Sequence, residues 1–456
     1  MNRRGIAASL LALALGGCFI EAPPNPEFTP LPETRPEQIE QVVFLVGDAG
    51  EAQLATSPVM VRVQQEVERW STALAREEGV SVLLLGDNAY PVGIREPSDP
   101  YRPEDSLHLR AQAEMVNGPN ARRWRNRGYF IAGNHDWGQS YGLEGLRRIR
   151  NQAEMLDKFA AEGMRVDLYP EAGLPGPAVV DAGENVRFVF MDTHWWLQAD
   201  RNNSLRDTVF FNVDQILRNS GNRAVLFVLH HPFSSGGPHG GPVPLWRGFG
   251  ILWLLNKTGS LVQDMNSPVY RELQGGMENL FKQIGRPLIA IGGHDHSLQV
   301  IEQDAPEKPQ WTLVSGSASK VSSVGPARGM KFAADKPGFM KLAFRKDGGG
   351  RAERVRRRPR LAALRGRRGR GRHPVHGGGL GEVRGGLFLT APSAPHHDGR
   401  SGHPDGSVRN LPGGRRPPAP LPLRGLSPIV GGTPLRCGSS RRPRKAGDPR
   451  LPFRRK

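Results

Sequence analysis

The sequence predicts an α/β domain in which helices cover the sheets, and three observations support this fold class. Short apolar runs rich in Val, Ile, Leu and Phe recur without alternating polar residues, as in strands buried on both faces. Stretches with helical periodicity lie between these runs. Glycine and polar residues follow the runs, where open α/β sheets gather their ligands. The apolar runs are residues 42–46, 80–85, 129–131, 186–191, 224–229 and 287–291.

Three segments are predicted to be helices. The first begins after Ser57, which can cap it, with Pro58 at the first helical position, and it ends at Gly79. The other two are residues 144–162 and 269–284. Helices that alternate with strands in this order indicate a layered α/β architecture. The apolar face of the first helix consists of Val59, Val63, Val67, Trp70 and Leu74.

The charge of the chain is concentrated at one end. The whole sequence has 62 Lys+Arg against 44 Asp+Glu, a net charge of +18. Residues 1–350 carry a net −3 and residues 351–456 a net +21. The basic composition therefore says nothing about the body of the protein. Only Cys18 and Cys437 occur, which excludes a disulfide scaffold, and no uninterrupted apolar run of about 20 residues predicts a membrane-spanning helix.

Residues 347–456 form an Arg/Gly/Pro-rich tail that we predict to be disordered. Residues 338–349 look like one strand that enters a hairpin turn, yet the Arg-rich residues that follow cannot supply its partner strand. The tail has 24 Arg but only two Lys beyond residue 350. This composition favours a frameshift or read-through product over an arm that binds nucleic acid, so nucleic acid is not an expected partner.

The first residues predict export. Residues 1–18 have the form of a signal peptide, with Arg3 and Arg4 before a short apolar stretch. Their end, Leu-Gly-Gly-Cys18, resembles a bacterial lipobox, which implies a membrane anchor through a lipidated Cys18; the alternative is an ordinary signal peptide. Phe19 after the cysteine favours the outer membrane. Residues 19–40 are rich in Pro and Glu, as in a tether, and the folded domain is expected at 41–346.

Five of the predicted strands end in residues that can bind metals. Carboxylate, imidazole, amide and phenolate groups together suit zinc, manganese or iron rather than a thiolate site. A carboxylate among them can bridge two cations, which would then bind a phosphoryl group from both sides. The five segments are Gly47-Asp48-Ala49-Gly50, Gly86-Asp87-Asn88-Ala89-Tyr90, Gly133-Asn134-His135-Asp136, His230-His231-Pro232 and Gly292-Gly293-His294-Asp295-His296.

Asp48 and the motifs GDNAY, GNHD, HHP and GHDH, in this order, resemble those of the calcineurin-like metallophosphoesterases over about residues 42–346. Within that family the chain looks most like the purple, tartrate-resistant acid phosphatase branch. That branch lacks the His of an Asp-x-His first motif and has a Tyr three residues after its bridging Asp, as Tyr90 stands after Asp87. The resemblance implies an αββα fold, a two-sheet β-sandwich flanked by helices.

The resemblance also implies two metal sites. Asp48, Tyr90 and His296 would hold Fe(III), because a phenolate suits a hard trivalent cation. A divalent ion (Fe, Zn or Mn) would be held by Asn134, His230 and His294, and Asp87 would bridge the two ions. His230 is preferred to His231 as a ligand because the family motif is His-x-Pro.

The implied activity is that of a phosphomonoesterase in which a metal-bound hydroxide attacks phosphorus. His135 would face the phosphate, and His239, nine residues after His230, would protonate the leaving oxygen. Asp136 and Asp295 are candidates for orienting neighbouring ligands. The alternatives are a phosphodiesterase with the same site and a binding module without catalysis. The apolar residues 244–255 predict either a lid, a membrane-surface segment or a buried hairpin or helix.

Overall fold

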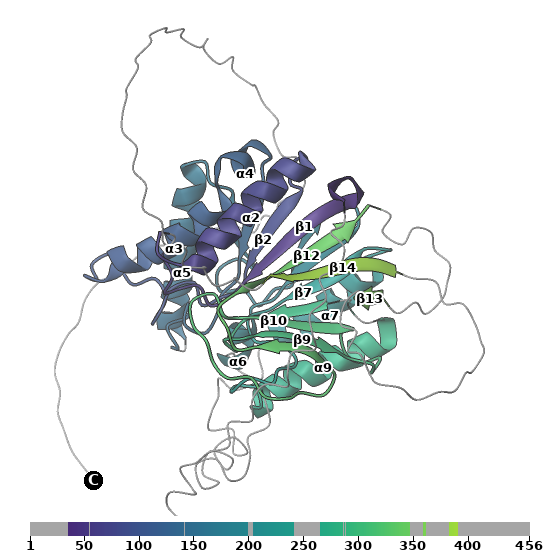
Figure 1. Cartoon of the computed structure of the whole chain (residues 1–456). Coiled ribbons are helices and arrows are strands. Elements are labelled where there is room, and N and C mark those ends of the chain that lie inside the picture. Colours follow the sequence, from purple (N-terminus) through teal and green to yellow (C-terminus); the bar gives the residue numbers. More distant parts are fainter. Residues whose placement is uncertain are drawn as a thin grey trace, which may run out of the picture. The chain divides into compact units, whose positions relative to one another are not determined.

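The computed structural model describes residues 35–346, apart from 54, 141, 199–203, 241–264, 286 and 288, and the backbone of 359–361 and 383–390. The strands of this part of the chain form two sheets (Figure 1). The first has the order β13 (Pro359–Leu361), β14 (Val383–Thr390), β12 (Phe339–Arg345), β1 (Ile39–Val46), β2 (Val80–Leu84), β3 (Arg127–Phe130), β4 (Val166–Leu168). The second has the order β11 (Met330–Ala334), β9 (Leu298–Glu302), β10 (Trp311–Ser315), β8 (Ile289–Gly292), β7 (Ala224–Val228), β6 (Val186–Phe190), β5 (Ala178–Ala182).

Each sheet contains four adjacent parallel strands. In the first sheet β1 to β4 run parallel, and in the second β6, β7, β8 and β10 do. Their carboxyl ends are the strand ends from which the predicted site residues follow. The helices are α2 (Pro58–Leu74), α3 (Arg102–Val116), α4 (Pro119–Arg123), α5 (Leu143–Ala161), α6 (Thr193–Gln198), α7 (Leu205–Arg218) and α9 (Pro268–Ile284), after a short 3-10 turn, η1 (Pro36–Gln38).

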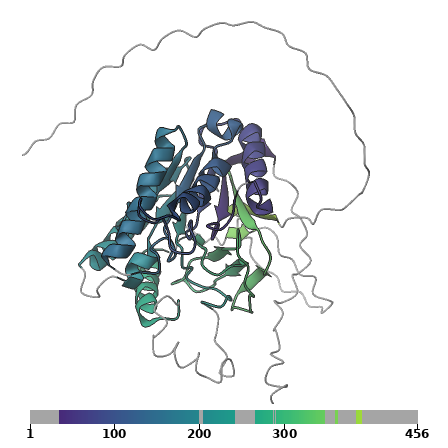
Figure 2. The same ribbon diagram turned by 90° about the vertical axis from the view of Figure 1, so that its left-hand side faces the viewer.

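Alternate residues of the central strand β1 show how the layers are stacked. Val42 and Phe44 pack in one apolar cluster with the inner face of α2, whereas Val43 and Leu45 pack in another with the second sheet. A third cluster joins the outer face of the second sheet to α6, α7 and α9. The helices thus cover the outer faces of two sheets that pack on each other (Figures 1 and 2). The predicted αββα arrangement is confirmed.

The three predicted helices appear as α2, α5 and α9. The Ser57 side chain accepts a hydrogen bond from the backbone N–H of Met60 at 3.3 Å, so it caps α2 as expected. Helix α2 ends at Leu74 rather than at Gly79, because Ala75 adopts the left-handed conformation. The sequence did not predict α3, whose buried positions include the polar residues Asp105, His108 and Gln112 and therefore lack an apolar periodicity.

The structure leaves several predicted segments undescribed. The signal peptide, residues 19–34 of the tether, the apolar segment 244–255 and most of the tail lie outside the described residues. Within the tail, β14 pairs antiparallel with β12. The partner strand of β12 is therefore residues 383–390, and not the Arg-rich residues that directly follow β12. Among the helices that are described, none has the length and apolar character needed to cross a membrane.

Candidate metal centre

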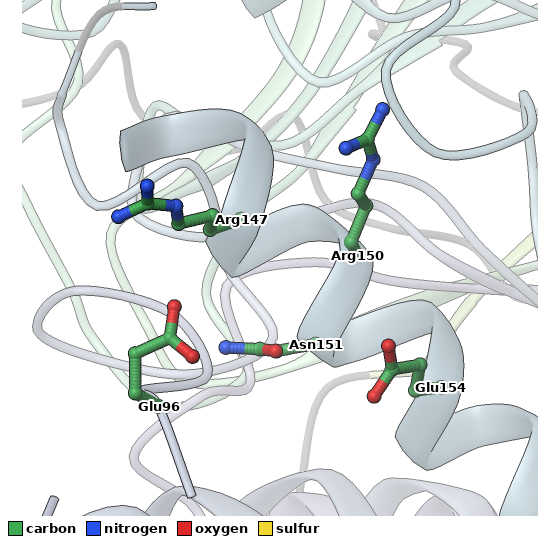
Figure 3. Close-up of a pocket in the computed structure, with 5 residues that line it drawn as sticks. All are labelled: Glu96, Arg147, Arg150, Asn151 and Glu154. Carbon is green, nitrogen blue, oxygen red and sulfur yellow. The ribbon is translucent and has the colours of Figure 1, made fainter. Parts of the chain in front are cut away.

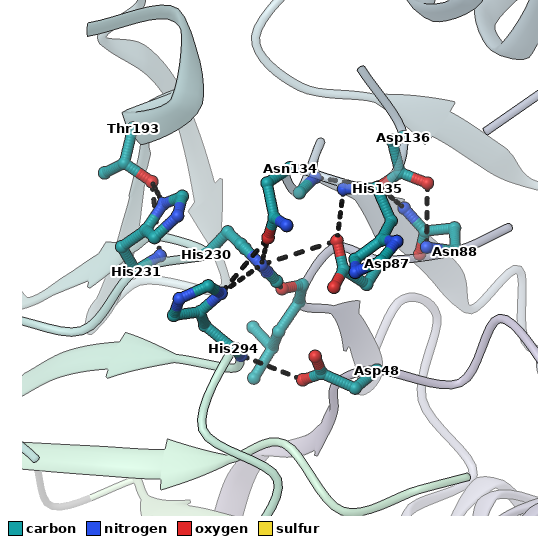
Figure 4. Close-up of polar contacts among 12 residues, drawn as sticks. Asp48, Asp87, Asn88, Asn134, His135, Asp136, Thr193, His230, His231 and His294 are labelled. Carbon is teal, nitrogen blue, oxygen red and sulfur yellow. Dashed lines mark hydrogen bonds and ion pairs between the residues drawn. The ribbon is translucent and has the colours of Figure 1, made fainter. Parts of the chain in front are cut away.

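The seven predicted ligands lie together at the carboxyl ends of strands from both sheets. Figure 4 shows five of them: Asp48, Asp87, Asn134, His230 and His294. Loops after β1, β2 and β3 carry Asp48, Asp87, Tyr90 and Asn134, and loops after β7 and β8 carry His230, His294 and His296. Six of these side chains are buried, and the side chain of His296 is 22% exposed. Residues that are 248 positions apart in sequence therefore share one site.

One group of these side chains surrounds the hydroxyl of Tyr90. The Tyr90 Oη lies 2.9 Å from Asp87 Oδ2 and 3.2 Å from Asp48 Oδ1. His296 Nε2 lies 3.3 Å from the same hydroxyl and 3.4 Å from Asp48 Oδ1. These are the residues that the sequence assigned to Fe(III).

A second group surrounds the amide oxygen of Asn134. His230 Nε2 lies 3.0 Å and His294 Nδ1 3.1 Å from Asn134 Oδ1, and the two ring nitrogens are 3.2 Å apart. His230 Nε2 is also 3.4 Å from Asp87 Oδ1. Asp87 thus turns one oxygen toward each group, as a bridging carboxylate would.

His231 is part of the same histidine cluster but has a different partner. Its Nδ1 lies 2.8 Å from the hydroxyl of Thr193 (Figure 4). Ligand atoms of His230, His231 and His294 lie close enough to hold an ion, as do those of Asp48, Asp87 and His230. Of the two adjacent histidines, His230 is the one that faces Asp87 and Asn134.

The chemistry of these atoms fits a cation. His230 Nδ1 faces the carbonyl oxygen of Leu85 at 2.8 Å, so a neutral ring carries its proton there and turns the lone pair of Nε2 toward Asn134 Oδ1 and Asp87 Oδ1. Nε2 and these two oxygens are all hydrogen-bond acceptors, so they repel one another unless a proton or a metal ion lies between them. Burial would lower the pKa of His230, but the charges of Asp87 and Asp48 outweigh it and raise that pKa. The cluster therefore attracts either a proton or a metal ion.

Backbone strain marks the same positions. Asp48, Asp87 and His294 have φ angles of 58°, 55° and 65°, in the left-handed region that non-glycine residues seldom adopt. Each follows a glycine and lies two or three residues after the end of a strand. Such strain costs of the order of 1 kcal/mol or more per residue and clusters at functional sites. At Gly133 a Cβ atom would lie 2.2 Å from Asp87 Oδ1, so only glycine fits beside the carboxylate.

Asp136 joins two of the ligand-bearing loops. Its Oδ1 accepts hydrogen bonds from the backbone N–H groups of Asn88 at 2.8 Å and Ala89 at 3.2 Å. Its Oδ2 accepts from Asn88 Nδ2 at 3.0 Å and from the N–H of Gly133 at 2.7 Å. Asn88 and Gly133 adjoin Asp87 and Asn134, so this buried carboxylate fixes one loop against the other, as expected for an orienting residue.

The two histidines with predicted catalytic roles border the cluster. The backbone N–H of His135 donates to Asp87 Oδ1 at 2.9 Å, and its ring packs 4.4 Å from that of Tyr90. His239 is exposed, and its ring lies 4.5 Å from that of His294. The N–H of His239 donates to Asp295 Oδ1 at 3.0 Å, so this contact of Asp295 is to the predicted acid rather than to a predicted metal ligand.

One positively charged side chain at this site, Lys320, was not predicted from the sequence. Lys320 Nζ lies 3.4 Å from the centroid of the Tyr90 ring and 2.8 Å from Glu51 Oε1. Lys320 follows β10, an apolar strand that was not among the predicted ones. The signal that could have found it is the run 311–315, which precedes a Gly/Ser-rich turn just as the other ligand strands do.

A cavity of about 330 Å³ lies elsewhere, between α5 and the segment near Glu96 (Figure 3). It contains none of the predicted site residues. Its lining is charged and polar: Glu96, Arg147, Arg150, Asn151 and Glu154.

A comparison with protein-family models identifies the family of the chain. Residues 43–298, more than half of the chain, match the family described as calcineurin-like phosphoesterase. The anchor protein GAP50 of the inner membrane complex of Plasmodium is 14% identical, with a TM-score of 0.40 over 67% of this chain and 81% of that one. A dimetal phosphatase from Danio rerio is 14% identical, with a TM-score of 0.33 over 68% of this chain and 94% of that one. No curated protein matches the chain.

Proposed function

The chain belongs to the calcineurin-like phosphoesterase family, and on this basis we propose that it is a phosphomonoesterase that works with two metal ions. The observation that carries the proposal is the position of Asp87, whose two oxygens face two separate groups of ligand atoms. Family membership makes the protein a metal-dependent phosphoesterase. The preference for monoesters and the identity of the metals are our inferences.

We assign Fe(III) to Asp48, Asp87, Tyr90 and His296, because the phenol oxygen of Tyr90 lies between two carboxylates. We assign a divalent ion (Fe, Zn or Mn) to the second group, whose imidazole and amide atoms suit a softer cation. A bound pair of this kind lowers the pKa of water and draws charge from phosphoryl oxygens. The second group consists of Asp87, Asn134, His230 and His294.

His135 and His239 would act on the substrate from two sides of the cluster. His135 Nδ1 lies 2.7 Å from the carbonyl oxygen of Pro91 and donates its proton there, and Nε2 lies 3.0 Å from Gln139 Nε2. An imidazolium form of His135 would donate a hydrogen bond from Nε2 to a phosphate oxygen. The exposed ring of His239 stands beside His294, where it can donate a proton to a leaving oxygen.

Hydrolysis of p-nitrophenyl phosphate and of its bis-ester by the full chain tests this proposal, with Asp87→Ala as the control. Monoester turnover that is lost in the variant would support it. Preference for the bis-ester would make the protein a phosphodiesterase. No turnover of either ester with both metals bound would favour the binding module without catalysis.

We further propose that the protein is exported as a bacterial lipoprotein and anchored, at the outer membrane, through Cys18. Support comes from the signal-peptide form of residues 1–18 and the Pro/Glu-rich residues that follow. Replacement of Cys18 by Ser should move the protein from the membrane fraction to the soluble fraction. A variant that remains in the membrane fraction would contradict the anchor.

A further inference from the structure

We propose that Lys320 binds the phosphate group of the substrate and favours dianionic monoesters over monoanionic diesters. This inference rests on the proposed phosphoesterase function. It begins from the position of the ammonium group, 3.4 Å above the ring of Tyr90, whose hydroxyl contacts Asp48 and Asp87. The cation therefore lies against the ring of one predicted metal ligand, whose hydroxyl contacts two others.

The segment that carries Lys320 is fixed to both sheets. The N–H of Ser319 donates to the carbonyl oxygen of Asp48 at 3.2 Å, and the N–H of Ser322 donates to that of His296 at 2.8 Å. Lys320 thus stands between two hydrogen bonds to residues of the predicted Fe(III) group. These two hydrogen bonds join the backbone on either side of Lys320 to the loops that carry Asp48 and His296.

The partner of Lys320 is one that a phosphate can replace. The ion pair with Glu51 is 2.8 Å long, but the side chains are 29% and 49% exposed. Such pairs contribute little net stability because solvent screens them and both chains lose freedom. A phosphate dianion held at the metals would offer Lys320 a stronger, charge-assisted hydrogen bond. Glu51 would then act as the resting partner of the lysine.

The charge of Lys320 distinguishes the two ester classes. Near neutral pH a phosphate monoester carries close to two negative charges, whereas a diester carries one. An ammonium group beside the metals therefore gains more from the monoester. His135, which packs against the same Tyr90 ring, would contact the phosphate alongside it.

Affinity for inorganic phosphate tests the inference by calorimetry on the metal-loaded full chain. Lys320→Met keeps the alkyl stem over Tyr90 and should weaken phosphate binding about tenfold or more, the loss expected for one charge-assisted hydrogen bond. Glu51→Gln should tighten binding because it releases the lysine. The matched control is Lys331→Met, which removes a lysine that pairs with Glu302 at 3.0 Å on edge strand β11 and should leave the affinity unchanged.

Three results with the variants would overturn the inference. The first is that Lys320→Met binds phosphate with an affinity within twofold of the wild type. The second is that Lys320→Met and Lys331→Met lose equal phosphate affinity, and the third is that Lys320→Met loses its bound metal. A wild type that does not bind phosphate would overturn it as well. If the wild type binds phosphate but hydrolyses no ester, the proposed function fails, while the phosphate affinities still decide the role of Lys320. With turnover, KM for the monoester should rise more than KM for the diester.

Discussion

Replacement of Asp136 by Asn should weaken both the fold and the metal centre. The carboxylate accepts four hydrogen bonds, two at each oxygen, from the loops that carry Asp87 and Asn134. Asparagine offers one acceptor atom, and its amide N–H groups would face the two donors at the other position. Two buried donors then lose their partner, at about 1–3 kcal/mol each, so we expect a loss of about 2–6 kcal/mol in the free energy of unfolding.

The assays for this variant are urea unfolding of the metal-free protein and metal content after dialysis. Loss of an orienting contact typically lowers metal affinity about 10–100-fold. The matched control is Asp105→Asn, which removes a buried carboxylate that pairs with Arg95 at 2.6 Å. The control should lose stability but keep its metals. If Asp136→Asn unfolds within 1 kcal/mol of the wild type and binds both metals as tightly, our account of the loop contacts is wrong.

Three further predictions concern the ligands, the acid and the pH dependence. Tyr90→Phe should abolish the visible charge-transfer absorption of the iron-loaded protein; an unchanged spectrum would remove Tyr90 from the ligands. His239→Gln should lower kcat about 10²-fold or more for alkyl phosphates and less for p-nitrophenyl phosphate, whose leaving group needs no proton; equal losses would contradict an acid role. Burial raises the pKa of Asp192 from 3.8 to about 6, against hydrogen bonds from Trp195 and Trp137. Because the folded state holds this proton more tightly, the stability that Asp192 contributes is present below about pH 4 and is lost as the pH rises through about 6. The difference in unfolding free energy between the wild type and Asp192→Asn should therefore change by about 3 kcal/mol across that window in urea titrations, and a constant difference would refute the assignment.

The predictions that the structure agrees with rest on short-range sequence features. Each predicted ligand follows an apolar run, and parallel strands bring their carboxyl ends to one edge. The grouping of Asp48, Asp87 and His294 in one site could therefore be predicted from the sequence before the order of the strands was known. The end of α2 was misplaced because Ala75, not a glycine, takes the left-handed conformation, at a cost that tertiary contacts must offset.

The apolar run 311–315 indicates a strand before Lys320, but it does not show which residues Lys320 would contact. Its role depends on the pairing of β10 between β9 and β8, which brings residue 320 over the ring of Tyr90. No periodicity in the sequence encodes that order of strands. The orienting contact of Asp136 is similar, because its four donors lie in two loops whose approach is set by the fold.

Because the ligands are divided between the two sheets, the metal site can form only late in the synthesis and folding of the chain. The carboxylates and the phenol come from the first half of the domain, and all three imidazoles come from residues 230–296. A nascent chain that has been synthesised only to residue 290 still lacks His294 and His296. A chain that is partly synthesised or partly folded therefore carries no complete site, and the free energy of metal binding becomes available only when the two sheets have come together. Under the export that we propose, the compartment in which the chain folds, rather than the one in which it is made, would determine which metals it acquires.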